Sequence, residues 1–202
     1  VDNHIVTLTA TISIGGSDDA PSRALDPATG VKTFAVGEQV AVFYIHYDGG
    51  VSYLMYKAES AALTSEDISN GGKAAKITVT LDSPAEGSNI RIVYPASRAT
   101  ATSISPGLPY DDSQTLNLAA LGSQDGTLTS LQGLDLAVYD GSLSETDLPA
   151  KITLENRLAV MAYTLKDATG KSDITGSITG MTVSDGTNKY SVTREAAGGP
   201  IY

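Results

Sequence analysis

The chain has 202 residues and a formal net charge of -10 at pH 7. This length suits one large or two small globular domains, and the excess of acidic residues disfavours a nucleic-acid or anionic-membrane partner, whose phosphates would be repelled. Cysteine is absent, which excludes disulfides, thiol chemistry and sulfur-bound zinc.

The first predicted element is a strand over residues 5–14. Its apolar residues alternate without a break with threonine or serine. Such period-2 alternation, rich in β-branched residues, is typical of a strand that turns one face to a core. The apolar face consists of Val6, Leu8, Ala10, Ile12 and Ile14.

The segment after this strand is rich in Gly, Asp and Pro and carries Arg23. A well-patterned strand on a flexible tether suggests a strand that an Arg-specific or trypsin-like protease can cut free. Its departure would expose an apolar groove with unpaired backbone groups, which a strand of another chain could fill. An ordinary first strand and loop is the simpler alternative, and the pattern alone favours it. Arg98 and Arg194 have similar local sequences, so a loop arginine is an unspecific signal.

The rest of the chain consists mainly of short strand patterns separated by Gly, Asp and Pro turns. The run at 40–47 is apolar on both faces, which predicts a central strand. Asp48-Gly49-Gly50 predicts a hairpin to a return strand at 51–57. Because no long stretch holds helical periodicity, we expect an all-β sandwich. Further strands are predicted at 76–81, 89–94, 134–139, 152–154, 158–165, 174–183 and 189–193.

We expect two domains. Residues 1–152 form an N-terminal β-sandwich, which includes the first strand and the tether to Arg23. Residues 153–202 form the start of a second β-sandwich, because three or four strands are too few to bury a core alone. The final residues look like a turn that enters a further strand, so we expect this second domain to be incomplete as given.

No catalytic, metal or cofactor motif stands out. His4 and His46 lack a neighbour at metal-ligand spacing, and the Gly-x-Ser-x-Gly, Gly-x-Gly-x-x-Gly and P-loop patterns are absent. The acidic loops at 18–19, 111–112 and 140–147 do not match EF-hand spacing, which favours solvated carboxylates and leaves bound calcium as the lesser alternative. We therefore expect a protein that is not an enzyme and needs no cofactor.

Several segments, taken in order along the chain, resemble the fimbrillin-like family, the type V pilins of Gram-negative gut and oral bacteria. Each motif is short, and their order carries the resemblance. The segments are the opening strand with Ser22-Arg23-Ala24, then Phe34-Ala35-Val36-Gly37-Glu38-Gln39-Val40-Ala41-Val42, Ile90-Arg91-Ile92-Val93-Tyr94-Pro95, residues 124–137 ending in Leu134-Asp135-Leu136, and residues 152–165.

The resemblance implies two transthyretin-like β-sandwich domains and export to the cell surface as an outer-membrane-anchored lipoprotein precursor. It also implies that an Arg-specific protease cleaves the Arg23–Ala24 bond and removes the first strand, after which other pilin subunits join by donor-strand exchange. We expect the strands at 77–81 and 90–92 to line the groove left behind. The expected function is that of a structural subunit or accessory protein of an adhesive fimbria.

Two other functions are open from the sequence alone. One is a surface-anchored β-sandwich module that binds a glycan or a host protein, with tyrosines as a stacking platform for sugar rings. The tyrosines lie in apolar runs, however, where core packing is the more ordinary role. The other is an acidic secreted hydrolase, for which no site is visible.

Overall fold

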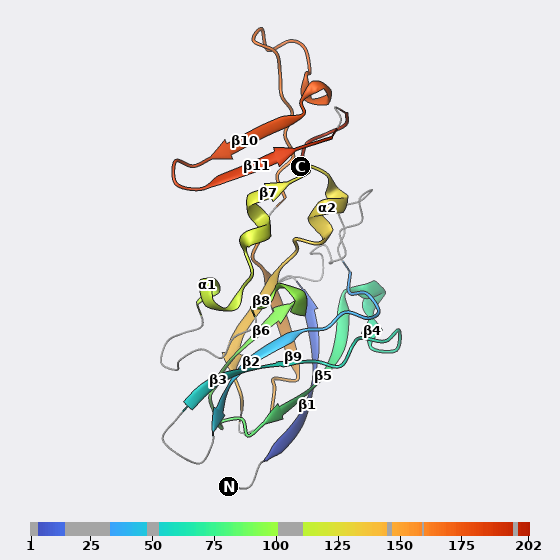
Figure 1. Cartoon of the computed structure of the whole chain (residues 1–202). Coiled ribbons are helices and arrows are strands. Elements are labelled where there is room, and N and C mark those ends of the chain that lie inside the picture. The colour runs from blue at the N-terminus through green and yellow to red at the C-terminus, as the bar shows by residue number, and fades with distance from the viewer. Residues whose placement is uncertain are drawn as a thin grey trace. The chain divides into compact units, whose positions relative to one another are not determined.

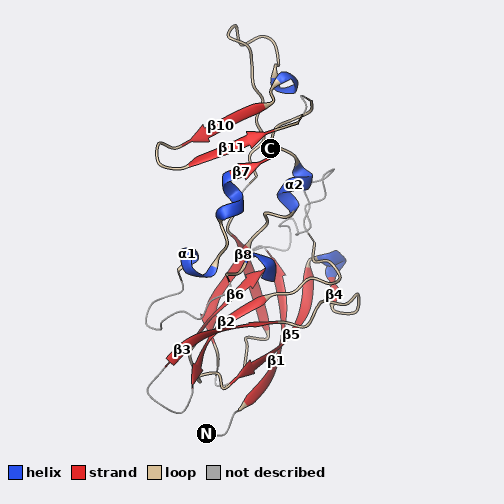
Figure 2. Ribbon diagram, viewed as in Figure 1, coloured by secondary structure: helices blue, strands red, loops and turns tan. Residues whose placement is uncertain are grey.

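The computed structural model describes residues 4–14, 33–47, 53–100, 111–144, 147–158, 160–195 and 198–202. These residues are organised mainly as β-strands (Figures 1 and 2), which confirms the all-β class. The strands are β1 (Ile5–Ile14), β2 (Ala41–Tyr47), β3 (Tyr53–Glu59), β4 (Ile68–Ser69), β5 (Ala74–Asp82), β6 (Asn89–Tyr94), β7 (Ser123–Gln124), β8 (Ala137–Ser142), β9 (Lys151–Asn156), β10 (Gly180–Ser184) and β11 (Lys189–Thr193).

Helices are short throughout the described chain. The two α-helices are α1 (Asp112–Thr115) and α2 (Leu128–Gln132), and 3-10 turns lie at Asn70–Gly72, Ala96–Arg98, Ala119–Gly122 and Thr175–Ser177. None of these helices has the length and apolar character needed to span a membrane.

The described residues form two compact units. The first takes in the described residues within 4–14, 33–117 and 136–157, and the second takes in those within 118–135 and 158–202. All of β9 belongs to the first unit, which therefore continues past residue 152. The segment 118–135 leaves the first unit and packs in the second.

The first unit is built on one eight-stranded sheet, in the order β3-β2-β6-β8-β9-β1-β5-β4. Paired strands in it are antiparallel, except that β1 and β9 are parallel. The sheet curves back on itself, because Ser60 after β3 bridges Val79 of β5 and the Ala61 amide donates to the Thr78 carbonyl over 2.8 Å. Its two halves thus enclose one core. The transthyretin-like topology stays a prediction.

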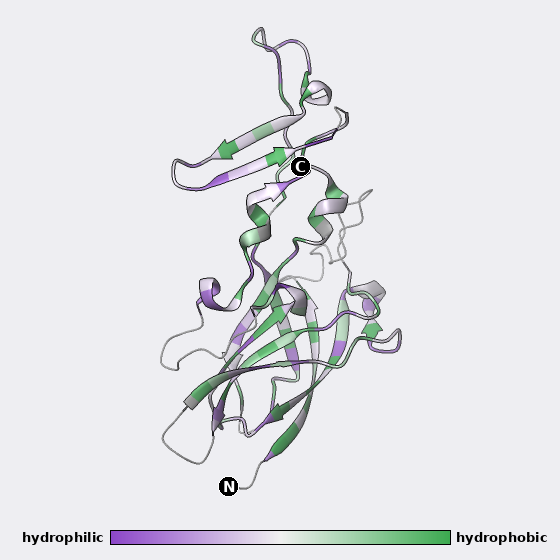
Figure 3. Ribbon diagram, viewed as in Figure 1, coloured by the Kyte–Doolittle hydropathy of each residue, from purple (hydrophilic) through white to green (hydrophobic). Residues whose placement is uncertain are grey.

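Alternation along the strands determines which side chains fill this core. In β1, β5 and β9, buried apolar residues alternate with more exposed, mostly polar ones (Figure 3). The strand β2 is covered on both faces, as its apolar run predicts: Val42 and Tyr44 belong to the core, whereas Ala41 and Phe43 are buried on the opposite face.

The second unit contains a three-stranded sheet, in the order β10-β11-β7. The strands β10 and β11 form the hairpin predicted across residues 184–188. The hydrophobic residues buried in the described part of this unit are Val192 and Ile201. So small a core gives few apolar side chains a place to pack.

The strand predicted at 158–165 is wrong. In its described residues the structure has only an isolated bridge, from Tyr163 to Ile201. Val160 and Met161 are exposed. Apolar alternation forms a stable strand only where a core covers one face, and this unit provides little core.

We expect Ile12→Ala to lower the free energy of unfolding of the first unit by about 2–5 kcal/mol. Ile12 is 0% exposed and lies between β5 and β9, so the truncation leaves a cavity. Urea denaturation followed by circular dichroism measures the loss. The matched control is Thr9→Val on the exposed face of β1, which should change the stability by no more than about 0.5 kcal/mol. Equal losses would contradict the packing of β1 described above.

Candidate functional site: the slot of the first strand

The first strand of the chain is inserted between two strands that come much later. The antiparallel register of β1 with β5 runs from Ile5↔Asp82 to Ser13↔Ala74. The parallel register of β1 with β9 runs from Thr11↔Lys151 to Ile14↔Leu154. We call the place of β1 between β5 and β9 the slot (Figure 1). Because β1 occupies it, the sheet is continuous from β3 to β4.

The two halves of β1 are held differently. Residues 11–13 pair with both β5 and β9, and Ile14 pairs with β9, whereas residues 5–10 pair with β5 alone among the described strands. Near the start of β1, the Ser83 amide donates to the His4 carbonyl over 2.7 Å. A half-paired strand leaves one row of backbone groups without a ladder partner. The half that begins at Ile5 is therefore the half from which β1 detaches more easily.

The structure places the five apolar residues of the proposed removable strand on one face of β1. Leu8, Ala10, Ile12 and Ile14 are buried in the core, and Val6 is half-buried and packs against it. Burying each large side chain of this kind stabilises by roughly 1.5–3 kcal/mol before ordering entropy is subtracted. The occupied slot therefore contributes strongly to the stability of the first unit.

One predicted wall of the slot is correct and the other is wrong. Ile77, Val79 and Leu81 of β5 lie beside β1 and face the core with it. The strand at 90–92 does not line the slot, because β6 pairs with β2 and β8. Its place is taken by Ile152 and Leu154 of β9. The alternation in this strand is visible in the sequence, but a parallel pairing needs a long crossover that periodicity does not reveal.

Two of the three arginines with similar local sequences are held by the fold. Arg98 is buried in the 3-10 turn Ala96–Arg98. The Arg194 guanidinium donates to the carbonyls of Thr175 over 3.1 Å and Ile178 over 2.8 Å, and also to that of Gly198. A protease must unfold these segments before it can bind either arginine. The proposed cleavage residues, Arg23 and Ala24, lie outside the described residues.

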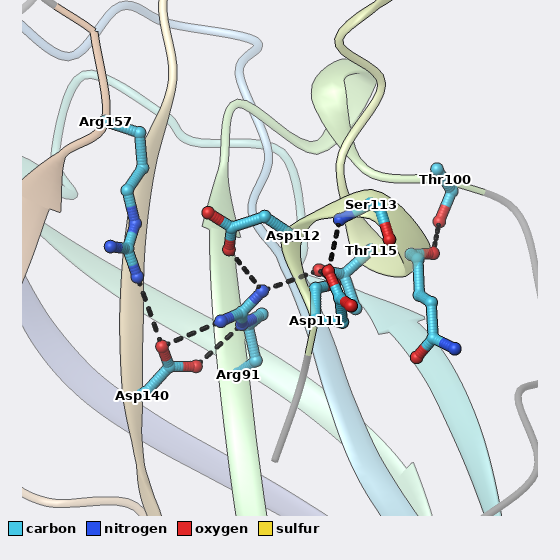
Figure 4. A network of polar contacts seen from close by, with 9 residues as sticks. Arg91, Thr100, Asp111, Asp112, Ser113, Thr115, Asp140 and Arg157 are labelled. Atoms are coloured by element: carbon cyan, nitrogen blue, oxygen red, sulfur yellow. Dashed lines mark hydrogen bonds and ion pairs between the residues drawn. The ribbon is translucent and has the colours of Figure 1, made fainter. Parts of the chain in front are cut away.

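A charged network lies on the face of β6 and β8 opposite the core (Figure 4). Its centre is Arg91, which is 3% exposed, and its neighbours Ile90 and Ile92 point to the core on the other face. Period-2 alternation therefore places the guanidinium under the segment that contains α1. We call this set the outer-face network; its members are Arg91, Asp112, Thr115, Asp140 and Arg157.

The Arg91 guanidinium connects two strands and a helix. Its Nε and Nη2 donate to the two carboxylate oxygens of Asp140 over 2.6 and 2.9 Å, and Nη1 donates to Asp112 over 2.8 Å and to the Thr115 hydroxyl over 2.7 Å. A bidentate pair of this kind is among the stronger polar contacts. Burial alone would lower the pKa of Arg91, but Asp140 and then Asp112 raise it above the ordinary value. The buried arginine is therefore charged and fully paired with its neighbours.

Asp112 and Asp140 keep 45% and 44% of their side chains exposed to solvent, as expected of loop carboxylates, but both also form ion pairs with Arg91, which the sequence does not predict. Asp140 also accepts a hydrogen bond from Arg157 over 3.3 Å. A sequence signal for this site exists, because a lone charged residue inside an apolar strand must find a partner when it is buried. The partners themselves come from distant segments and are not visible in the pattern.

Asp111 caps the first turn of α1. Its carboxylate accepts a hydrogen bond from the Ser113 amide over 2.8 Å. Hydrogen bonds from the backbone and side chain of Ser113, followed by the charge of Arg91, lower the pKa of Asp111. The cap therefore prefers the ionised carboxylate.

Aromatic side chains are used mainly for packing in the first unit. Tyr44 and Tyr94 are buried, which fits core packing better than a sugar platform. Burial raises the pKa of Tyr44, whose hydroxyl accepts from the Asp82 amide over 3.1 Å. His46 stacks on Tyr56 with ring centroids 4.2 Å apart. Within the described ranges, no group of three or more acidic or histidine side chains could hold a metal ion.

Comparisons with known proteins give a distant likeness. No family model matches the chain, and no curated protein matches it. A fimbrial assembly protein from Parabacteroides distasonis ATCC 8503 has a similar solved structure, with 10% sequence identity and a TM-score of 0.31. The match covers 75% of this chain and 53% of that protein, so the chain spans about half the length of its neighbour. A likeness this distant assigns neither fold nor function.

We expect Arg91→Lys to lower the free energy of unfolding by about 2–4 kcal/mol, because lysine keeps the charge but cannot bind Asp140, Asp112 and Thr115 together. Urea denaturation measures the change. In the control, Arg157→Ala removes one surface contact of 3.3 Å and should cost no more than about 1 kcal/mol. Similar losses in the two variants would contradict the central place of Arg91.

We expect the Asp111 carboxyl to titrate below its ordinary value in a carboxyl NMR titration, because the folded state stabilises its ionised form. Since its pKa is lower in the folded chain, its contribution to stability is present above the unfolded pKa and is lost as the pH falls through the folded pKa. Asp111→Asn keeps a cap without this titration. Relative to that variant, the wild-type chain should lose stability on acidification, and an unchanged difference would contradict the cap.

Proposed function

We propose that this chain is a non-catalytic structural subunit or accessory protein of a cell-surface fimbria that mediates adhesion, and that β1 is the strand exchanged during assembly. An Arg-specific protease cuts after Arg23 and frees β1, and a strand of another pilin subunit then enters the slot. The observation that best supports this proposal is the insertion of β1, the first strand, between β5 and β9.

An empty slot would be a strong acceptor for a strand. Departure of β1 uncovers apolar side chains of β5 and β9. It also leaves the backbone N–H and C=O groups that paired with β1 without hydrogen-bond partners. An extended segment that enters the slot recovers backbone hydrogen bonds and places alternate side chains in the core. Specific binding between subunits follows from the same interactions that hold β1 in the single chain.

The rest of the first unit has contacts that do not involve β1. The Ser60–Val79 bridge joins β5 to the segment after β3, and the Tyr47 amide donates to the Ser83 carbonyl over 2.8 Å. The outer-face network lies on β6, β8 and α1, away from the slot. These contacts support a unit that keeps its two halves together while β1 leaves and another strand enters.

The resemblance of the sequence to the fimbrillin-like family agrees with this proposal. It also suggests the partner, the donor strand and the cellular location. The ordered segments from the opening strand to residues 152–165 imply other pilin subunits as partners, a donor strand from the end of a second domain, and an outer-membrane-anchored lipoprotein precursor. The fold adds a further point, since Arg98 and Arg194 are both held by folded segments. Cleavage at either of these two arginines therefore requires local unfolding first.

We expect an Arg-specific protease to cut the full-length protein, with its donor strand, after Arg23 before it cuts at Arg98 or Arg194, because those two side chains are held by the fold. Mass spectrometry locates the cut, and size-exclusion chromatography detects the oligomers that follow. Arg23→Gln is the control and should yield neither product. A wild-type chain that is cut after Arg23 but stays monomeric, with β1 retained, would contradict assembly by strand exchange.

A further inference from the structure

Large and small side chains alternate across the slot. Ala10 of β1 is paired with Ile77 of β5, and Ile12 is paired with Ala75. All four side chains are buried, and Ala10, the most exposed of them, is only 4% exposed. Each pair combines one large side chain with one alanine, and the order is reversed from one pair to the next. At these two pairs, the large side chain of one strand therefore packs beside the alanine of the other.

Elsewhere in the slot both partners are large. Leu8 is paired with Val79, and on the β9 side Ile12 is paired with Ile152 and Ile14 with Leu154. The pairs that contain Ala10 and Ala75 are thus the two in which the paired side chains differ strongly in volume. A close-packed core is sensitive to volume at the scale of a single methylene group.

The alternation of apolar and polar residues in β1, its binary pattern, does not by itself fix the register of β1 against β5. A slip by one residue turns the threonine face to the core and is rejected, but a slip by two residues keeps every apolar side chain inside. A slip by two in one direction places Ile12 against Ile77, which overpacks the core. A slip in the other direction places Ala10 against Ala75, which leaves a cavity.

We infer that the Ala10–Ile77 and Ile12–Ala75 pairs select the strand that the slot accepts and fix its register. The incoming strand of the partner subunit carries a small side chain opposite Ile77 and a large apolar side chain opposite Ala75. Its core-facing side chains opposite Val79, Ile77 and Ala75 are therefore large, small and large. Alanine suits the small position best, since a buried serine lacks a partner and glycine weakens a strand. This inference rests on the proposed function, because it names the strand that the same slot takes in.

Peptide exchange into the slot tests this selection. The full chain carries an inserted site for a sequence-specific protease within residues 15–32, and it is nicked there so that β1 stays bound but is no longer covalently attached. Fluorescent peptides with the sequence of residues 5–14 then compete with β1, and their uptake is measured by anisotropy. The matched control peptide combines Ala10→Ile with Ile12→Ala, which keeps the composition and the binary pattern and reverses only the order of sizes.

We expect the reversed peptide to bind about tenfold or more weakly than the native peptide, because it overpacks one pair and leaves a cavity in the other. A slot variant that combines Ala75→Ile with Ile77→Ala, and carries the reversed sequence in its own β1, should prefer the reversed peptide. Should this variant not fold, the comparison of the two peptides on the wild-type slot still decides the question.

The outcomes separate this inference from the proposed function. Preference for the native peptide, with reversal of the preference in the slot variant, supports the selection by size. Equal uptake of the native and reversed peptides overturns the selection and leaves strand exchange intact. Failure of every peptide to replace β1 in the nicked chain overturns strand exchange itself, and the selection with it.

Discussion

The backbone ladder that holds β1 between β5 and β9 is the constraint on which the first unit depends. It joins the first strand of the chain to strands that come much later, and it makes one continuous sheet from two halves that face each other across a core. The alternation of residues 5–14 supplies the buried face. Because local pattern and distant pairing agree, a single short strand contributes strongly to the whole unit.

Ion pairs and hydrogen bonds hold the opposite face of the sheet. There, Arg91 connects α1 to β6 and β8 through paired carboxylates, so polar contacts act on the same face as the buried side chains of Ala41 and Phe43. The slot and the outer-face network are therefore distinct. One depends on the shape and burial of apolar side chains, and the other depends on charge and hydrogen-bond geometry.

The sequence predicts elements well where the signal is local. The bounds of β1 follow from alternation, those of β6 follow from its apolar run and the proline at position 95, and the hairpin of β10 and β11 follows from its turn. The strand at 158–165 fails because the second unit offers its apolar residues little core. The β9 wall of the slot and the partners of Arg91 depend on pairings between distant segments, which periodicity cannot supply. Arg23 and Ala24 lie outside the described residues.

The long antiparallel register of β1 with β5 also has a mechanical consequence. Hydrogen bonds between strands run perpendicular to the strand axis, so a pull along β1 loads the whole ladder from Ile5 to Ser13 at once. A pull across the sheet at Ile5 would instead break the bonds one after another. A strand held in this place thus resists tension along its axis far better than peeling from its end, which is the property that a load-bearing filament requires.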